Sequence, residues 1–478
     1  MPSSLKFNWR ELQQITAGCW SSHNGRNLKN GVTAICDDSR TLSANALFVA
    51  VKGTLADGHN FVEQAVANGA AAVCVEPRRM TVSQEDAVRR VGVPILEVEN
   101  TLFAYHALAR VWRRRCPRAT VIGITGTSGK TSLRAILEAI MRAAYGQERV
   151  LATHGNMNNQ FGVPRNLLRM STQHRVAVIE MGTNQPGEIA RLAAMVEPDI
   201  AVITTIGRGH LECFGTVEAV GREKAALLSA LPSTGIGILR DKCPARDQLL
   251  QAVGNRRVLL FGPSEDADVQ VRYAGVTGNS MYHLDFSGPV PDLPRQVEWP
   301  VGGRHQAINA AAAVATAKAM GIASEEIVAG LQGAQLPDMR MQRVEKHQCH
   351  WVNDAYNANP DSMRAAIDWF AELAGNAPAA AKWLVLGDML ELGDSARKEH
   401  VATLEWVRRR LPAANILPTG QHMQCAAQQI GLRGFPGAAA VAEELYERIE
   451  PGDWILLKGS RGVKLEKILH EYASSTCQ

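Results

Sequence analysis

The chain has 478 residues, of which 46% are hydrophobic and 21% are charged, and its formal net charge is +4. These values are ordinary for folded globular proteins, and the length suits about three domains. They exclude a strongly basic nucleic-acid-binding protein. No apolar run is long enough to cross a membrane, and nine scattered cysteines without a CxxC pair offer neither a zinc site nor a disulfide framework.

Residues 1–115 are expected to form the first domain. Short apolar runs at 46–51 and 70–75 predict strands, and turn signals such as Asp57-Gly58 separate them. The basic stretch 113–118 is interpreted as an exposed linker at the end of this domain.

The stretch Gly-Thr-Ser-Gly-Lys-Thr-Ser at 126–132 follows an apolar run that predicts a buried strand. Behind it, Leu133, Ile136, Leu137 and Ile140 have the spacing of one helix face. A strand, a glycine-rich turn and a helix form a phosphate cradle, because backbone N–H groups and the helix N-terminus face an anion. The residues expected to hold a nucleotide here are Gly126, Thr127, Ser128, Gly129, Lys130, Thr131 and Ser132.

Strands and helices alternate over residues 116–335, which predicts an α/β domain with a mostly parallel sheet. Two further apolar runs, at 176–179 and 200–203, are followed by Glu180 and, some residues later, by His210. Because ligands bind at the carboxyl ends of parallel strands, these two side chains are candidates for a Mg²⁺-triphosphate site. Lys224 lies on a predicted helix, where a solvated lysine is the ordinary reading.

The segment 262–300 interrupts this rhythm and predicts a hairpin or extra antiparallel strands. Residues 336–478 again alternate, with strands predicted at 351–353, 383–386, 416–418 and 454–457. A helix is expected to begin after Asn359, which can cap it, with Pro360 in the first position. The cluster Arg408–Arg410 is interpreted as a solvated helix end.

Polar, amide-rich turns follow the strands of this third unit. Residues 353–363 place an acid, a tyrosine and several amides at a strand-to-helix turn, more amides than capping requires. The turns 386–393 and 457–462 are also charged and glycine-rich. We therefore expect a polar ligand at these turns.

At this point the residues resemble a known family, the Mur ligases, which are ATP-dependent amide ligases of bacterial cell-wall synthesis. The resemblance is collinear over nearly the whole chain. Its motifs are 37–40, 47–50, 57–61, 126–131, 155–164, 179–182, 210–215, 303–310, 354–363, 387–393 and 458–461. The motifs at 354–363 and 387–393 match the branch that uses D-alanyl-D-alanine, and the signature of the branch that adds the third amino acid is not found.

The resemblance implies a three-domain α/β architecture with domains at 1–115, 116–335 and 336–478. The first domain would bind a UDP-sugar, and the second would be a P-loop domain that binds ATP. The third would be a C-terminal Rossmann-like domain. It implies that Thr131 and Glu180 ligate one Mg²⁺ and His210 a second, and that Lys224 is carbamylated on Nζ and belongs to the metal site. Lys130, Glu180, His210 and Lys224 would be the catalytic residues. Further nucleotide-binding residues would be His305, Asn309, Arg340 and Asp354.

The implied partners are a UDP-N-acetylmuramoyl tripeptide and D-alanyl-D-alanine. The enzyme is expected to be a cytoplasmic monomer that binds no nucleic acid and does not insert into a membrane. The implied substrate-binding residues are Ser39, Arg40, Asp57, Asn156, Asn158, Asn159, Tyr356, Asn357, Asn359, Lys458, Ser460 and Arg461. The chain departs from the family pattern at Ser128, Gln306 and Ala226. Two alternatives stay open: a ligase that adds the third amino acid, and a nucleotide-binding regulatory protein that has lost ligation.

Overall fold

The computed structural model describes residues 6–21, 31–54, 56–276, 281–375, 377–378 and 381–469. Within these ranges, no helix has the length and apolar character that a membrane crossing requires. The chain groups into two compact units. The first comprises Met1–Gly123, Tyr145–Gly182 and Ala190–Asp199, and the second comprises Ile124–Ala144, Thr183–Ile189 and Ile200–Gln478.

A five-stranded sheet lies in the N-terminal part of the first unit, with strand order β1-β5-β4-β3-β2. All neighbouring strands are parallel except β1 and β5. Its strands are β1 (Cys19–Trp20), β2 (Ala34–Cys36), β3 (Ala46–Val49), β4 (Ala72–Val75) and β5 (Ile95–Glu97), and the helices are α1 (Trp9–Thr16), α2 (Val62–Ala67), α3 (Val82–Val91) and α4 (Thr101–Arg114). The predicted strands at 46–51 and 70–75 are confirmed as β3 and β4.

The interpretation of the basic stretch 113–118 as an exposed linker is wrong at its start. Helix α4 continues to Arg114, and Arg113 is only 8% exposed. Its guanidinium donates to the carbonyls of Val196 and Glu197 and pairs with Asp199 at 3.0 Å. A local charge pattern cannot reveal these partners, because they lie more than 80 positions away in the sequence.

The central sheet has nine strands in the order β14-β13-β12-β11-β10-β9-β6-β8-β7. Its strands are β6 (Thr120–Thr125), β7 (Val150–Ala152), β8 (Val176–Glu180), β9 (Ile200–Ile203), β10 (Ile236–Arg240), β11 (Arg257–Gly262), β12 (Val269–Val276), β13 (Tyr282–Ser287) and β14 (Val297–Trp299). Strands β9 to β12 are parallel, whereas β12, β13 and β14 are antiparallel. The extra antiparallel strands predicted for 262–300 are therefore confirmed.

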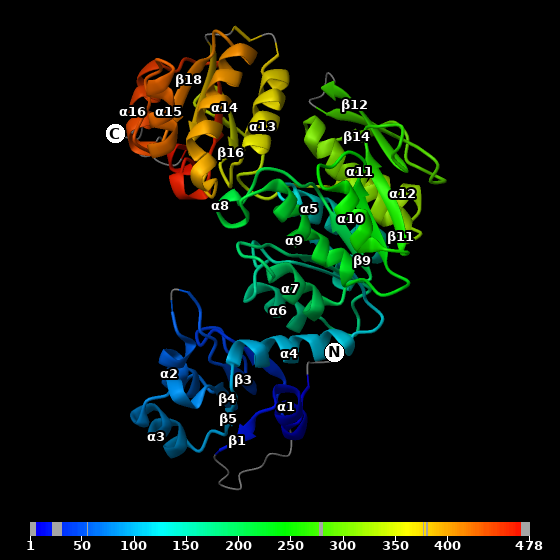
Figure 1. The fold of residues 1–478 in the computed structure, drawn as a ribbon, viewed down its shortest axis with the longest axis vertical. Helices are drawn as coiled ribbons and strands as arrows, with labels where there is room; N and C mark the ends of the chain where they lie inside the picture. Colours follow the sequence, from blue (N-terminus) through cyan, green and yellow to red (C-terminus); the bar gives the residue numbers. More distant parts are fainter. Residues whose placement is uncertain are drawn as a thin grey trace. The chain divides into compact units, whose positions relative to one another are not determined.

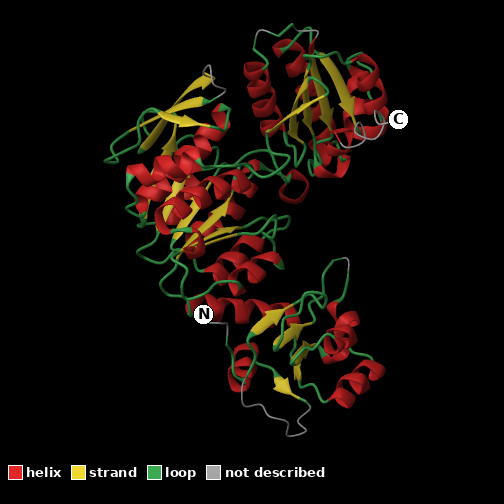
Figure 2. Ribbon diagram, turned by 180° about the vertical axis from the view of Figure 1, so that it is seen from behind, coloured by secondary structure: helices red, strands yellow, loops and turns green. Residues whose placement is uncertain are grey.

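Helices accompany the strands of the central sheet, as Figure 2 shows in red around the yellow strands. They are α5 (Lys130–Tyr145), α6 (Gly162–Leu168), α7 (Glu188–Val196), α8 (Leu211–Phe214), α9 (Val217–Ser229), α10 (Arg246–Val253), α11 (Arg304–Ala319) and α12 (Ser324–Gln332). The predicted apolar face of α5 is buried, including Leu133, Ile136, Leu137 and Ile140.

The C-terminal sheet has the order β15-β16-β19-β17-β18, with only β15 antiparallel to its neighbour. Its strands are β15 (Gln342–Lys346), β16 (Cys349–Asp354), β17 (Lys382–Gly387), β18 (Asn415–Thr419) and β19 (Trp454–Lys458), and its helices are α13 (Pro360–Leu373), α14 (Ala396–Arg410), α15 (Gln421–Gln429) and α16 (Ala438–Arg448). One apolar cluster joins α13, α14 and α15 to one face, and a second joins α16 to the other (Figure 1). All four predicted strands are confirmed, and α14 ends at Arg410 as expected.

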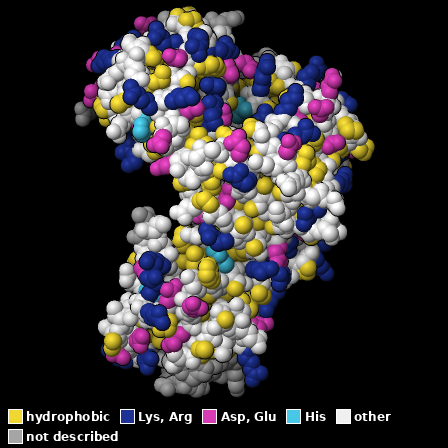
Figure 3. Space-filling view, viewed as in Figure 1, with side chains coloured by type: hydrophobic (Ala, Val, Ile, Leu, Met, Phe, Trp, Pro, Cys, Tyr) yellow, Lys and Arg dark blue, Asp and Glu magenta, His cyan; other side chains and the backbone are white. Residues whose placement is uncertain are grey.

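Acidic and basic side chains are interspersed over the surface seen in Figure 3. This distribution fits the small net charge.

Candidate active site

The loop between β6 and α5 has the geometry of a phosphate cradle. Gly126 has φ +148°, and a Cβ there would lie 2.0 Å from Oγ1 of Thr204. Gly129 has φ +84°, and a Cβ there would lie 2.7 Å from Oδ1 of Asn309. Both positions therefore require glycine, because the backbone conformation and the neighbouring side chains leave no room for a side chain.

Side chains of the second unit surround this loop. Nζ of Lys130 donates to the carbonyl of Gly126 at 2.9 Å. Arg340 donates to Oγ1 of Thr131 at 2.9 Å, and Asn359 donates to Oγ of Ser128 at 2.8 Å. Other hydroxyls of the loop also accept hydrogen bonds: that of Thr127 accepts from the N–H of Gly207 at 3.0 Å, and that of Ser132 accepts from Gln306 at 3.3 Å. Of the other predicted nucleotide residues, Asn309 and Arg340 thus lie beside the loop.

We expect Gly129→Ala to weaken nucleotide binding about tenfold. An alanine in a left-handed conformation costs about 1–2 kcal/mol, and its Cβ would press on Asn309. Gly146→Ala is the matched control, because Gly146 also has positive φ, +85°, but a Cβ there meets nothing within 4 Å. Calorimetric titration with ATP measures the effect. Equal affinities of the two variants would contradict this reading of the loop.

Glu180 ends β8 in the first unit and is 1% exposed. Its Oε1 accepts from Nδ2 of Asn158 at 2.8 Å. Asn159 has a different role, because its Oδ1 accepts the N–H groups of Phe161 and Gly162 at the start of α6. The structure therefore joins Asn158 to Glu180, whereas Asn159 stabilises the turn and Asn156 lies in the same turn.

Lys224 is not a solvated helix residue. It lies on α9 with 0% of its surface exposed, and its Nζ has no hydrogen-bond partner among the described residues. Burial lowers the pKa of Lys224 well below its usual value, and the charge of Lys130 lowers it further. An isolated ammonium in such a place is very unfavourable, so the side chain is either neutral or modified.

Nearby carboxylates are engaged by backbone rather than by Lys224. Glu223 accepts from the N–H groups of Gly187 at 2.7 Å and Ile189 at 2.8 Å. Glu188 accepts from the N–H groups of Asn184 at 2.7 Å and Gln185 at 3.1 Å. The two acids organise the turn before α7.

His210 precedes the short helix α8 and has φ +57°, in the left-handed region. Its Nδ1 lies 2.7 Å from Oε2 of Glu391, which itself has φ +66°. The hydrogen bond to His210 lowers the pKa of Glu391. Left-handed conformations are unusual for residues other than glycine and are found more often at functional sites. The two positive φ values therefore make this pair a candidate for a functional role.

The amide-rich turn after β16 forms a second polar cluster. The guanidinium of Arg340 lies over the ring of Tyr356 at 4.2 Å. Nζ of Lys458 pairs with Asp354 at 3.0 Å and donates to the carbonyl of Asn357 at 2.5 Å. These predicted residues come from distant parts of the sequence and are in contact in the structure.

Several other predicted residues have local roles. Asn359 caps α13 through the N–H of Ser362, as expected. Oγ of Ser460 accepts from the N–H of Leu390 at 3.0 Å and so joins two of the turns. Arg461 is mostly exposed and lies 3.5 Å from Glu466. His305 contacts Sδ of Met341, and burial lowers its pKa to about 4.

Ser39, Arg40 and Asp57 belong to the first unit. Ser39 donates to Gln64 at 2.8 Å, and Arg40 pairs with Asp38 at 2.8 Å, which lowers the pKa of Asp38 to about 2. Asp57 pairs with Nδ1 of His59 at 2.6 Å. Ser39 and Asp57 thus have structural partners, whereas the Arg40 side chain is 78% exposed.

Sequence reasoning missed four acidic and basic residues of the second unit. Arg208 pairs with Asp361 at 2.8 Å and with Glu399 at 3.0 Å. Glu391 is the partner of His210. No local signal could identify these pairs, because Asp361 and Glu399 lie 153 and 191 positions from Arg208.

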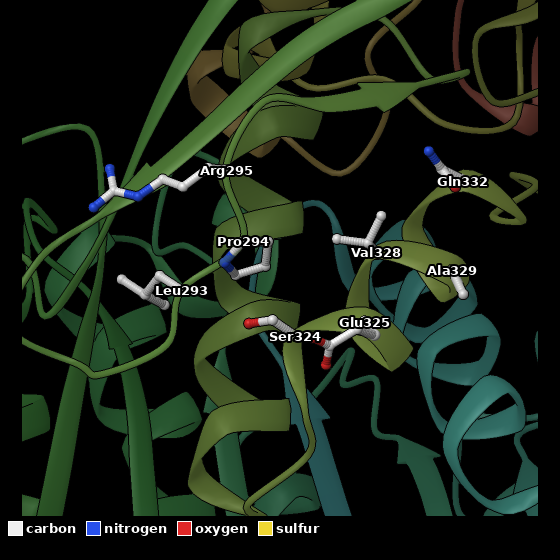
Figure 4. A pocket seen from close by; sticks show the side chains of 8 residues that line it. All are labelled: Leu293, Pro294, Arg295, Ser324, Glu325, Val328, Ala329 and Gln332. Carbon is white, nitrogen blue, oxygen red and sulfur yellow. The ribbon is translucent and has the colours of Figure 1, made fainter.

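The predicted site coincides neither with a cage of metal-ligating side chains nor with the hollow beside α12. Among the residues the structure describes, no group of three His, Cys, Asp or Glu side chains could hold a metal ion. A hollow of about 410 Å³ lies beside the first turns of α12 (Figure 4), and it contains none of the predicted site residues. It is lined by Leu293, Pro294, Arg295, Ser324, Glu325, Val328, Ala329 and Gln332.

Three family models match the chain. They are described as "Mur ligase family, catalytic domain" at residues 31–113, "Mur ligase middle domain" at 124–317 and "Mur ligase, glutamate ligase domain" at 339–461. The chain is 31% identical to a UDP-N-acetylmuramoyl-tripeptide–D-alanyl-D-alanine ligase of Bacillus subtilis, over 93% of this chain and 94% of that protein.

Solved structures agree with this similarity. The fold resembles that of MurF from Acinetobacter baumannii with a TM-score of 0.87 and 30% identity, covering 98% of this chain and 99% of that one. It also resembles MurF from Thermotoga maritima in complex with ADP, with a TM-score of 0.78 and 26% identity, covering 92% and 96%.

Proposed function

The chain belongs to the Mur ligase family, and we propose that it is an ATP-dependent ligase that joins D-alanyl-D-alanine to a UDP-N-acetylmuramoyl tripeptide in peptidoglycan precursor synthesis. The observation that carries the proposal is similarity to ligases with this name over more than nine tenths of the chain. The phosphate cradle between β6 and α5 supports it, since the reaction consumes ATP.

The reaction activates an acid and then transfers it to an amine. The terminal carboxylate of the tripeptide attacks the γ-phosphorus of ATP, which gives an acyl phosphate and ADP. The amine of D-alanyl-D-alanine then attacks the acyl carbon, the amide forms, phosphate leaves, and the amine loses a proton. Both partners of the first step are anions, so catalysis depends on placing positive charge between them.

The phosphate loop supplies part of this charge. Its main-chain N–H groups and the N-terminus of α5 face the phosphates, and Lys130 adds a mobile ammonium that can leave the carbonyl of Gly126. Arg340 lies beside Thr131 and adds a second cation at the same loop. We assign the adenosine part to Asn309, Asp354 and His305.

The donor set also fits Mg²⁺. Thr131 and Glu180 would hold one ion, and His210 would hold a second together with Lys224. Mg²⁺ keeps water and phosphate oxygens as ligands, so a cage of three protein side chains is not required. The ions supply charge neutralisation for the triphosphate and the developing phosphoryl group.

We propose that Lys224 is carbamylated. Its neutral Nζ attacks the carbon of CO₂, a C–N bond forms, and the nitrogen loses a proton, which leaves an anionic carbamate. Complete burial of Lys224, and the lack of a hydrogen-bond partner for its Nζ among the described residues, support this, because a carbamate would replace an unfavourable buried ammonium. Ala226 leaves the surroundings of the carbamate without the acid that relatives often have.

We also propose domain boundaries near 115/116 and 335/336. The family models at 31–113, 124–317 and 339–461 are compatible with them. The UDP-sugar would contact the turns holding Ser39, Arg40 and Asp57, and the peptide and amine ends would contact the turns around Asn158, Tyr356 and Ser460. A monomer in the cytoplasm, where ATP and the precursor occur, completes the proposal.

One assay tests the proposed function. Phosphate release is measured with UDP-N-acetylmuramoyl tripeptides that end in lysine or diaminopimelate, and with D-alanyl-D-alanine as the amine. We expect release that depends on both substrates. Release with the dipeptide precursor and free lysine or diaminopimelate would instead indicate the ligase that adds the third amino acid. ATP binding without any release would indicate a regulatory protein that has lost ligation.

A further inference from the structure

We propose that Glu391 is a positioning residue for His210, which it reaches from the C-terminal turn between β17 and α14. The carboxylate holds the proton on Nδ1 of the imidazole and leaves Nε2 to face a metal ion. The inference rests on the proposed metal role of His210 and adds the residue that orients this ligand.

The contact indicates which tautomer the neutral imidazole adopts. Oε2 of Glu391 lies 2.7 Å from Nδ1 of His210, and an ionised carboxylate can only accept a hydrogen bond, so we infer that the hydrogen is on Nδ1. The lone pair then lies on Nε2, which is the atom free to ligate. Metal-binding histidines ordinarily donate their other N–H to such an acceptor, which fixes the ring and increases ligand basicity.

The backbone on both sides holds this pair in place. The N–H of Glu212 donates to the carbonyl of Glu391 at 3.1 Å, and a Cβ at Gly393 would lie 3.0 Å from Cα of Glu212. His210 and Glu391 both have positive φ. Such conformations cost about 1–3 kcal/mol each and persist only where the surroundings determine them.

Arg208 supports the same contact from a second side. Its guanidinium pairs with Asp361 at the start of α13 and with Glu399 on α14. The backbone N–H of Arg208 also donates to the carboxylate of Asp361 at 3.1 Å. The segment that carries His210 is therefore held by three acids, all from the C-terminal domain.

A solvated surface ion pair is the ordinary alternative, since the Glu391 side chain is 47% exposed. Surface pairs contribute little to stability. An effect on His210 as a ligand, without a large effect on folding, therefore separates the two explanations.

The test compares Glu391→Ala and Glu391→Gln with the unchanged enzyme. Glutamine can still accept from Nδ1 through its amide oxygen, whereas alanine cannot. The matched control is Glu345→Gln, because Glu345 makes a similar 2.7 Å contact with Nδ1 of His350 on β16. Thermal melting confirms that each variant is folded.

Two readouts do not depend on turnover. Mn²⁺ is titrated by electron paramagnetic resonance in the presence of a non-hydrolysable ATP analogue, and the tautomer of His210 is read from ¹⁵N shifts, with His210→Gln to assign its signals. We expect Glu391→Ala to weaken one class of Mn²⁺ sites about 10- to 100-fold and to lose the Nδ1–H form. Glu391→Gln should keep that form and weaken binding less.

Unchanged Mn²⁺ affinity and an unchanged tautomer in Glu391→Ala would overturn the inference. A similar loss in Glu345→Gln would also overturn it, because the effect would then not be specific to His210. Failure of the proposed function would be seen elsewhere, as absent phosphate release by the unchanged enzyme with D-alanyl-D-alanine.

Discussion

Replacement of Lys130 by alanine is expected to lower turnover by about a thousandfold or more, roughly 4 kcal/mol of barrier. The reason is electrostatic. The first chemical step brings a carboxylate to a triphosphate, and both are anions. Lys130, the first residue of α5, provides a positive charge at the phosphate cradle. Its ammonium lies 2.9 Å from the carbonyl oxygen of Gly126, at the loop that we propose binds the phosphates.

Steady-state phosphate release with saturating substrates measures this effect. Lys398→Ala is a suitable control, because Lys398 is an exposed lysine on α14 and is not one of the predicted site residues. If Lys130→Ala kept a turnover within a few-fold of normal, the assignment of this loop as the phosphate-binding loop would be wrong. Loss of ATP affinity alone, with turnover unchanged at saturation, would assign Lys130 to ground-state binding instead.

Lys224→Ala is expected to be nearly inactive and to regain part of its activity with small carboxylates such as formate or acetate. The substitution removes the proposed carbamate and leaves a space at a fully buried position whose electrostatics include the charge of Lys130. A small anion can enter that space and restore the negative charge. Phosphate release measured over a range of carboxylate concentrations tests this, and intact mass of the unchanged protein reports an added carboxyl group.

Two further variants separate chemistry from folding. Lys224→Met keeps the length of the side chain but has no nitrogen to modify, so it should be folded, inactive and not rescued, since its bulk fills the space. Lys224→Arg should be inactive as well, because a guanidinium stays charged and forms no carbamate. Activity of Lys224→Arg near the normal level, together with no rescue of Lys224→Ala, would dismiss the carbamate.

Much of the fold could be predicted from local patterns. The apolar runs at 176–179 and 200–203 became β8 and β9, and the alternation over the C-terminal third gave the expected strands. Asn359 and Pro360 predict the start of α13, because capping depends only on residues that are close in the sequence. The phosphate loop was also recognisable, since its glycines are required by backbone geometry within a few residues.

Other features could not be predicted because their cause lies far away in the sequence. Arg113 was expected in an exposed linker and is buried against the carbonyls after α7. The local pattern alone favours a solvated face for Lys224, and only the family resemblance places it in a site; nothing within its own helix indicates that its surroundings exclude water. The surroundings of both side chains are set by tertiary packing. A periodic pattern identifies the apolar face of a helix but not the elements that pack against it.

The α/β class, the position of the phosphate loop and the family resemblance follow from the sequence, because each depends on short patterns of residues adjacent in the chain. The contacts between distant side chains do not follow from it. They are Glu391 with His210, and Arg208 with Asp361 and Glu399, and the same holds for Lys224, which is buried with no hydrogen-bond partner among the described residues. Burial and hydrogen bonding depend on distance in space, which the order of residues in the chain does not fix.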